Sequence, residues 1–232
     1  MCRYPIFEEY AVSITLSTGA TAAVAKTYSP VRTVAGTTIT AISNANPALV
    51  TATHSLSVGD YVVIESGWGL LDQRVCRVGT VNTTVSFTLE GVDTLDQTKY
   101  PPTGGVPGTF REITDWSVLT QVKGVSASGG AQQFADITSI TDTVKKQIPT
   151  IKDAVNMTID VFDDPALAWY TDVTVADDAR APYGLLMTFA NGSKLVANAY
   201  WSLLKVPTIT TNEALMTQIA LSYAAEPLRY ST

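Results

Sequence analysis

The amino-acid sequence predicts a mainly β protein, and three observations lead to this fold class. Thr, Val, Ala and Ser dominate the composition, and the first two are typical of strands. Gly, Pro, Asn and Asp interrupt the chain about every ten residues, as they do between short antiparallel strands. Several segments alternate apolar and polar side chains, which gives a strand one buried face and one solvated face.

Four segments in the second half of the chain have the clearest strand patterns. They cover residues 155–161, 183–190, 194–204 and 214–223. In the first of them, Met157 and Ile159 are separated by Thr158, which places the two apolar side chains on one face. Asn191-Gly192 lies between the second and third segments and favours a two-residue turn, so these two segments form a predicted hairpin.

One α-helix is expected after the first of these strands. Asp163 or Asp164 can cap its N-terminal amides, and Pro165 suits its first turn. An apolar face follows, which predicts that this side of the helix packs against the core. The residues expected in that packing are Leu167, Trp169 and Tyr170.

Residues 31–111 are predicted to form a small β-domain inserted into a larger one. The segment begins after Ser29-Pro30 and ends in the Gly- and Pro-rich loop 101–108, a composition that often bounds domains. Its expected strands cover residues 38–42, 48–53, 61–65, 73–81 and 85–89. Five strands can close into a small barrel. Residues 1–30 and 112–232 then form the larger domain.

The residue types on which many enzymes rely are scarce in this chain. His54 is the only histidine, which excludes a Ser-His-Asp triad elsewhere and a multi-histidine metal site, and it is predicted to be a structural turn residue. Cys76 lies in an apolar, strand-like run and is expected to pack as a small apolar side chain. Cys2 is the only other cysteine, so we expect no disulfide framework and a reducing compartment.

Other patterns that could carry chemistry have simpler structural explanations. Asp163-Asp164 and Asp177-Asp178 resemble paired carboxylates, but they lie at the two ends of the predicted helix, where capping and solvation account for them. Gly104-Gly105 and Gly129-Gly130 fit neither common phosphate-binding pattern and are interpreted as turns. We therefore expect no catalytic residue, no cofactor and no metal ion.

Charge and hydropathy argue against two further classes of protein. The net charge is −6 and the pI is near 4.7, whereas nucleic-acid-binding proteins need clustered Lys and Arg. The longest apolar runs are far shorter than the roughly 20 residues of a bilayer span, and the N-terminus lacks a signal pattern. We expect no membrane segment.

Short motifs follow one another in a characteristic order along the second half of the chain. They are Asp115-Trp116-Ser117-Val118-Leu119, Val122-Lys123-Gly124-Val125, Phe134-Ala135-Asp136, Asp160-Val161-Phe162, Leu167-Ala168-Trp169-Tyr170, Met187-Thr188-Phe189-Ala190-Asn191-Gly192-Ser193 and Tyr200-Trp201-Ser202. Their order and spacing resemble those of the lambda-type tail tube proteins of long-tailed bacteriophages, the siphoviruses. In that family the hairpin before the first motif is short, so we expect the extra domain to be an insertion at this point. The resemblance implies that residues 1–30 and 112–232 form a β-sandwich of two antiparallel sheets flanked by one helix.

The inserted segment carries its own set of motifs. They include Asn46-Pro47-Ala48-Leu49-Val50-Thr51, His54-Ser55-Leu56-Ser57-Val58-Gly59-Asp60 and Phe87-Thr88-Leu89-Glu90-Gly91-Val92-Asp93. This string is similar to a small β-domain found as an added module in phage structural proteins. Both resemblances therefore indicate a component of a virion.

The tail-tube resemblance implies a structural function. Six copies would form a ring, and rings would stack into a tube whose lumen is a continuous β-barrel. Genomic DNA would pass through this lumen into the host during ejection without specific binding. The implied partners are further copies of the chain and the tape-measure, tail terminator and tail-tip proteins. The implied location is the virion tail, after synthesis in the host bacterial cytoplasm.

In this family a long loop between early core strands contacts the neighbouring ring. By position it corresponds to residues 126–149, which are rich in Gly, Ser, Thr and Gln. The resemblance makes Gly129, Gly130, Gln132, Phe134 and Asp136 candidate assembly residues, with Phe134 as an apolar anchor. We expect this loop to be disordered in the free subunit and ordered in the tube, where interface contacts offset the lost entropy.

Three other function classes stay open on the sequence alone. The same β lineage includes tail terminators and baseplate ring components, which would form a single closed ring instead of an open polymer. The small β-domain also fits a carbohydrate- or host-surface-binding module. An enzyme that uses the Asp pairs and Tyr side chains is the remaining alternative.

Overall fold

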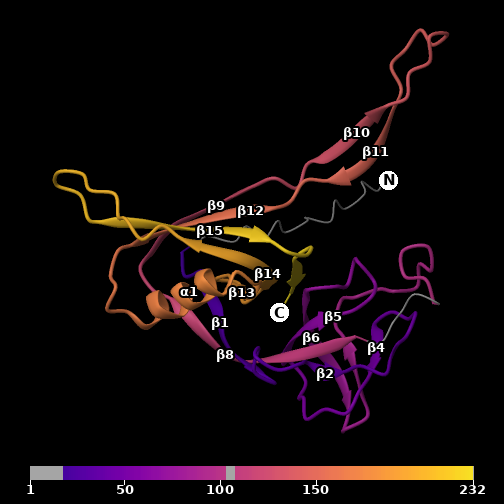
Figure 1. Ribbon diagram of the computed structural model, residues 1–232, viewed down its shortest axis with the longest axis horizontal. Coiled ribbons are helices and arrows are strands. Elements are labelled where there is room, and N and C mark those ends of the chain that lie inside the picture. Colours follow the sequence, from indigo (N-terminus) through magenta and orange to yellow (C-terminus); the bar gives the residue numbers. More distant parts are fainter. Residues whose placement is uncertain (1–17, 103–107, 232) are drawn as a thin grey trace, which may run out of the picture.

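The computed structural model describes residues 18–102 and 108–231, and over these residues the protein is mainly β (Figure 1). The strands of the larger part are β1 (Thr21–Ser29), β8 (Thr109–Leu119), β9 (Val122–Ser128), β12 (Asn156–Phe162), β13 (Tyr183–Thr188), β14 (Lys194–Leu203), β15 (Met216–Tyr223) and β16 (Leu228–Tyr230). Those of the smaller part are β2 (Thr37–Thr38), β3 (Ala41–Ile42), β4 (Ala48–Thr51), β5 (Tyr61–Glu65), β6 (Arg74–Asn82) and β7 (Ser86–Leu89).

These strands form one continuous antiparallel sheet. Its order is β3-β4-β7-β6-β5-β8-β1-β13-β14-β15-β12-β9, with β16 added to β14 and β2 added to β8. A separate two-stranded sheet contains β10 (Gln132–Asp136) and β11 (Gln147–Lys152). The helix α1 (Ala168–Ala179) packs on β14, β8 and β1. The prediction of a mainly β fold with one flanking helix is thus confirmed.

The strands expected in residues 31–111 occur where the sequence predicted them, apart from shifts of one or two residues and a break between β2 and β3. The smaller part curls on itself, because the Ile39 N–H donates to Gly108 O at 2.8 Å and the Thr40 N–H donates to Thr51 O at 2.8 Å. Its described strands do not close a complete ladder, so this part is barrel-like without being a closed barrel.

The strand β8 joins the two parts of the molecule. One end pairs with β2 and β5, and the other pairs with β1 from Ala22 to Ser29. The predicted boundary between residues 111 and 112 therefore lies inside a continuous strand. The division into an inserted domain and a host domain remains a prediction.

The predicted helix exists, but its start was predicted wrongly. It begins at Ala168, its N-cap is Leu167, and no side chain caps it. The Asp164 carboxylate instead accepts a hydrogen bond from the Ala166 N–H (Oδ1–N 3.1 Å), and the Asp164 carbonyl accepts one from Leu167. Asp forms such local turns readily, and here that turn delays the first helical residue.

The predicted hairpin is confirmed as β13 and β14, with a longer turn than expected. The Phe189 N–H donates to Ser193 O at 2.9 Å, so the turn encloses three residues instead of two. Gly192 adopts φ +80°, the left-handed conformation that ends a three-residue hairpin loop. The Asn-Gly pair was therefore a correct turn signal with the wrong loop length.

Candidate assembly interface

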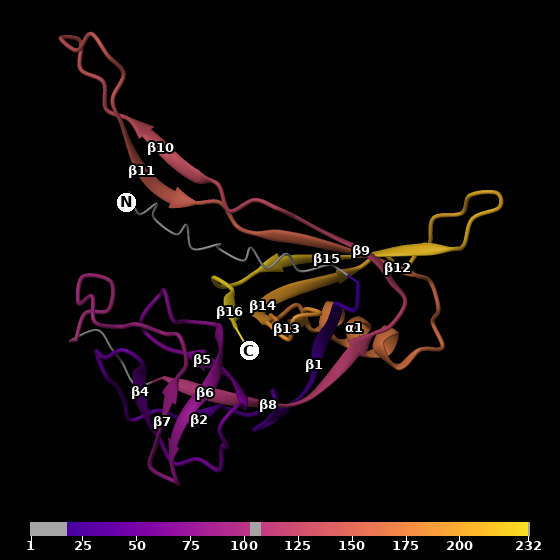
Figure 2. The ribbon, with the colours of Figure 1, turned by 180° about the vertical axis from the view of Figure 1, so that it is seen from behind.

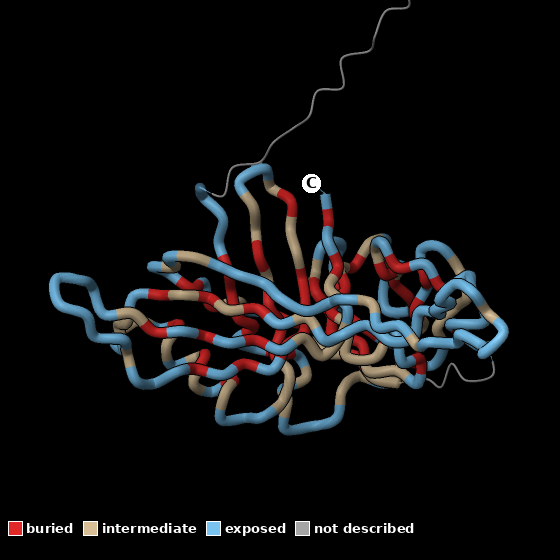
Figure 3. The backbone as a smooth tube through the Cα atoms, turned by 90° about the horizontal axis from the view of Figure 1, so that it is seen from above, coloured by how far each residue is buried: buried red, intermediate tan, exposed pale blue. Residues whose placement is uncertain are grey.

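The most distinctive surface lies on β9, β12, β15 and the last residues of β14. Buried and exposed residues alternate along the strands of the sheet (Figure 3). On the buried side, Ile159 lies opposite Ile219, which lies opposite Leu203. The opposite side, here called the polar face, carries Ser126, Asn156, Thr158, Asp160, Gln218, Ala220, Ser222, Tyr200 and Ser202.

The polar face has small side chains and few charges. Its carboxylate, Asp160, accepts a hydrogen bond from Gln218 (Oδ1–Nε2 2.9 Å). At its border, the Lys123 ammonium lies 3.3 Å from the Met216 sulfur. One negative and one positive group leave this face close to neutral, so it offers little counter-charge to a phosphate backbone.

Both edges of this four-stranded region lack a neighbouring strand in the described chain. The strand β9 pairs only with β12. The strand β14 pairs with β13 up to Ala199, while residues 200–203 pair only with β15. A strand edge of this kind exposes unpaired N–H and C=O groups and can accept a strand from another chain.

The candidate assembly residues lie in a hairpin that projects from the sheet. Residues 126–149 were predicted to be a flexible loop, but they include the end of β9, all of β10 and the start of β11 (Figures 1 and 2). Phe134 pairs with Pro149 and is 56% exposed, and Gln132 pairs with Lys152, its Nε2 donating to Thr150 O at 3.0 Å. Residues 129–154 are called the arm below.

Two of the predicted residues form the base of the arm. Gly129 and Gly130 have φ values of +85° and +72°, which favour glycine. A Cβ at Gly129 would lie 2.1 Å from the carbonyl oxygen of Ala154, so no larger residue fits without a backbone shift. The arm therefore leaves the sheet at an angle that requires glycine.

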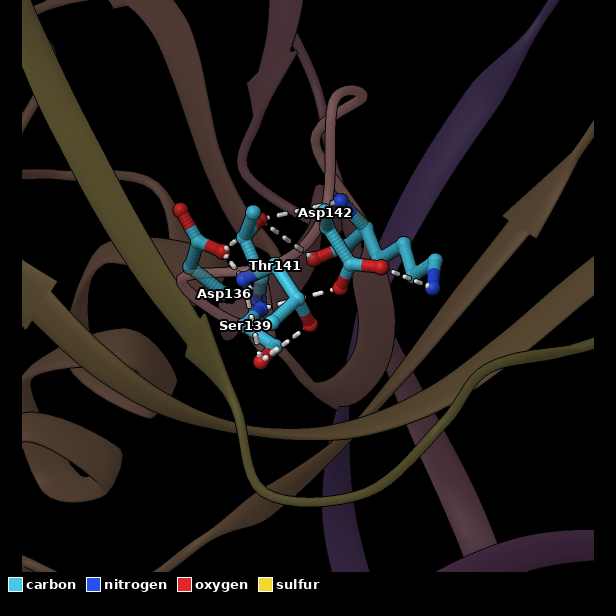
Figure 4. Close-up of polar contacts among 6 residues, drawn as sticks. Asp136, Ser139, Thr141 and Asp142 are labelled. Atoms are coloured by element: carbon cyan, nitrogen blue, oxygen red, sulfur yellow. Dashed lines mark hydrogen bonds and ion pairs between the residues drawn. The ribbon is translucent and has the colours of Figure 1, made fainter.

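The far end of the arm is held by short polar contacts (Figure 4). Asp136 accepts hydrogen bonds from the Thr138 N–H at 2.8 Å and the Thr138 hydroxyl at 2.5 Å. Asp142 binds Lys146 (Oδ1–Nζ 2.5 Å) and accepts a bond from the Ser139 N–H. Donation from Thr138 lowers the pKa of Asp136, and donation from Lys146 lowers that of Asp142. Both carboxylates thus stay charged and hold the turn.

The arm carries many apolar side chains that the rest of the chain does not cover. The exposed ones are Phe134, Ile137, Ile140, Val144, Ile148 and Ile151. Monomeric proteins rarely expose so many large apolar groups on one element. The arm therefore has the composition of a contact surface for another molecule.

The sequence predicted a packing role for Leu167, Trp169 and Tyr170, which lie at the start of α1. Trp169 is 2% exposed, and its ring centroid lies 5.7 Å from that of Tyr170. Leu167 and Tyr170 are partly buried against the core. Their position beneath the sheet makes them structural supports and not part of an exposed surface.

The residues weighed for catalysis are dispersed through the fold. His54 is buried and its Nδ1 accepts a hydrogen bond from the Leu56 N–H at 3.2 Å, as a structural turn residue would. Cys76 is fully buried, and burial raises the pKa of its thiol to about 12, so it packs as an apolar group. Cys2 lies outside the described residues.

The two Asp pairs that were weighed for catalysis also make structural contacts. Asp178 forms an ion pair with Lys205 at 3.5 Å, and Asp164 forms the turn before the helix. Within residues 18–102 and 108–231, no group of three or more His, Cys, Asp or Glu side chains could hold a metal ion. No helix there has the length and apolar character needed to cross a membrane. Gly104-Gly105 lies outside the described residues.

Two features of this interface were not predicted from the sequence. One is the open edge of β14, and the other is the exposed apolar loop between β14 and β15. The sequence does contain a signal for this loop. Val206 and Ile209 are large apolar residues in a run of Pro, Thr and Asn, where a solvent-exposed turn usually has polar residues.

Comparisons with known proteins give a family for the chain. No curated protein matches its sequence. Among solved structures, the anti-feeding prophage (AFP) baseplate, determined by cryo-EM with 6-fold symmetrisation, is 8% identical with a TM-score of 0.38, over 51% of this chain and 86% of that chain. The AFP tube-terminating cap is 19% identical with a TM-score of 0.34, over 46% of this chain and 79% of that chain.

The family match covers most of the chain. Residues 66–232 match the phage tail tube protein family (TTP), whose members are structural proteins and not enzymes. The match includes every strand of the polar face, the arm and the helix. The chain belongs to the phage tail tube protein family.

Proposed function

We propose that this chain forms the tail tube of a long-tailed, lambda-type phage, in which rings of six copies stack into a conduit for DNA. The observation that carries this proposal is the polar face with its two open edges. A sheet that is apolar on one side, polar on the other and unpaired at both edges is suited to continue into the sheet of a neighbouring copy.

Ring closure follows from the position of the two edges. The edge of β9 in one copy would pair with residues 200–203 of β14 in the next, and repetition around the ring would close a barrel without exposed edges. The side chains alternate along both strands, so the polar faces of all copies would point the same way. The apolar side and the helix would point outward.

The lumen would then be lined by the polar face. Its Ser, Thr, Asn and Gln side chains can hydrogen-bond to water, and its charges nearly cancel. DNA binding depends on neutralising phosphates with clustered cations, which this surface lacks. DNA could therefore pass without being retained, and conduction would need no catalytic group.

The other parts of the molecule receive roles that follow from this orientation. The arm would contact the next ring, and residues 31–111 would lie on the outside, because a lumen of fixed width has no room for additional domains. The tape-measure, tail terminator and tail-tip proteins would contact the lumen and the two ends of the tube. The virion tail is the corresponding location.

Negative-stain electron microscopy of the purified protein, fresh and after concentration, tests this function. We expect open-ended tubes of constant diameter. A single closed ring at every concentration would instead indicate a tail terminator or baseplate component. A monomer that binds glycans on an array and does not assemble would indicate a host-surface module.

A pair of proline substitutions tests ring closure itself. Ser126 and Ala127 are neighbours on β9, so their N–H groups point to opposite sides, one toward β12 and one toward solvent. Ser126→Pro and Ala127→Pro each remove one backbone N–H. The variant that loses the N–H bonded to β12 has a weaker fold, and the other variant loses only a donor at the open edge. The variant that keeps the wild-type melting temperature should lose ring formation; normal rings from it would contradict the proposed pairing.

A further inference from the structure

Two apolar projections lie at opposite ends of the molecule. The arm ends in Ile140, which is fully exposed, and Val144, which is 72% exposed. The loop between β14 and β15, residues 204–215, carries Val206 and Ile209, which are 71% and 79% exposed. The arm and this loop extend from the sheet in opposite directions in both ribbon views (Figures 1 and 2). Within one copy they cannot cover each other.

A notch at the base of this loop carries negative charge. It has a volume of about 110 Å³ and is lined by Asp160, Thr208, Thr210, Glu213, Ala214, Met216 and Gln218. Neither Asp160 nor Glu213 forms an ion pair with any described residue. Lys123 approaches the rim at Met216, which leaves two carboxylates against one ammonium. The notch can therefore accept one further cation.

The tip of the arm offers such a cation. Lys146 is already bound to Asp142 at 2.5 Å. Its neighbour Lys145 is exposed and forms no ion pair with any described residue. The tip thus presents one unpaired ammonium between exposed apolar side chains, which is the charge opposite to that of the notch.

We propose that the arm tip of one copy binds the notch and the β14–β15 loop of another copy, head to tail. Lys145 lies against Glu213 in this contact, and Ile140 and Val144 cover Val206 and Ile209. The contact joins two different surfaces, so each copy keeps one surface of each kind free for a further copy. Because the arm and the loop extend in opposite directions, repetition of this contact would extend the assembly as an open polymer. It rests on the proposed tube function and adds the acceptor site for the arm.

A charge exchange tests the polar part of the contact. Lys145→Glu and Glu213→Lys, each alone, should raise the critical concentration for polymerisation by about twofold to fivefold, the effect of one exposed or partly exposed ion pair. The double variant should return close to the wild-type value. Lys26→Glu is the matched control, because Lys26 is an exposed lysine on β1 with no ion pair among the described residues. Additive losses in the double variant would overturn the pairing.

A mixing experiment tests the direction of the contact. Copies with Ile140→Asp and Val144→Asp lack the arm surface, and copies with Val206→Asp and Ile209→Asp lack the loop surface. Neither variant should form tubes alone. The mixture should give complexes with twice the mass of either variant alone by light scattering, because the intact arm of one variant can still bind the intact loop of the other.

The outcomes separate this contact from the proposed function. If the wild-type protein polymerises and the mixture gives no complex, the head-to-tail contact is wrong while the tube assignment stands. If the wild-type protein remains a monomer at every concentration, both the proposed function and the head-to-tail contact are wrong.

Discussion

The contact between the C-terminal strand and the smaller part of the molecule gives a quantitative prediction. Tyr230 is 4% exposed, and its hydroxyl accepts a hydrogen bond from the Arg77 backbone N–H on β6 at 2.8 Å. The Arg77 guanidinium lies 4.5 Å from the centre of the Tyr230 ring and binds Glu90 (Nε–Oε2 2.6 Å). Burial raises the pKa of Tyr230, so its hydroxyl stays protonated at neutral pH.

The substitution Tyr230→Phe removes this hydroxyl and keeps the ring. The Arg77 N–H then loses its acceptor, which costs about 1–3 kcal/mol for a buried donor. Arg77 is only partly buried, and the contact of its guanidinium with the ring remains. We therefore expect a loss of about 1–2 kcal/mol in the free energy of unfolding. For a chain of this size, this lowers the melting temperature by about 2–8 °C.

Urea and thermal unfolding of the purified subunit measure this loss, with Tyr223→Phe as the matched control. Among the described residues, the Tyr223 hydroxyl donates a hydrogen bond only to the Met157 sulfur, a weak acceptor, at 3.8 Å. Its removal should therefore change stability by less than about 0.5 kcal/mol. Equal losses from the two variants would refute the reasoning. The two parts would then be fixed by β8 and not by this contact.

Three further predictions concern the helix and the arm. Trp169→Ala should lower the free energy of unfolding by about 3–5 kcal/mol in denaturant titration, because Trp169 is buried beneath the sheet. Gly129→Ala should reduce tube formation without unfolding the subunit. The control is Gly59→Ala, because Gly59 has φ +95° and no atom lies within 4 Å of the added Cβ, so this variant tests the backbone cost alone and should form normal tubes. The hydrogen bond from Lys146 lowers the pKa of Asp142 and stabilises the arm tip above the ordinary carboxyl pKa. The protection factors of the amides there, which correct for the slower intrinsic exchange in acid, should therefore fall as the pH drops below about 4.

The elements that the sequence predicted well are those with one buried face. In β12 the side chains of Met157, Ile159 and Val161 are buried and their neighbours are not, so a period of two is visible in the sequence. The same holds for β15. Burial within one chain imposes this pattern, and the pattern can therefore be recognised without a structure.

The arm was predicted as a loop from its position in the family resemblance, and its residues do not show this pattern. Residues of β11 are exposed on both sides, so apolar and polar positions do not alternate with burial. The start of the helix was predicted wrongly for another reason, because an Asp side chain such as that of Asp164 can either cap a helix or form a local turn. In the proposed tube the partner surfaces of the arm would lie in another copy, and a single sequence contains no record of their position.

The open edge of β14 has an explanation in the residues that precede β13. Tyr183 pairs with Ala199, so an extension of β13 would place Pro182 opposite Tyr200 and Ala181 opposite Trp201. Proline has no N–H to donate to such a ladder, and Arg180, which ends the helix, adopts φ +48°, outside the strand conformation. The strand β13 therefore cannot extend to cover residues 200–203. Because β14 continues past this point with Trp201 and Leu203 buried, the edge stays ordered and available to a strand from a second copy.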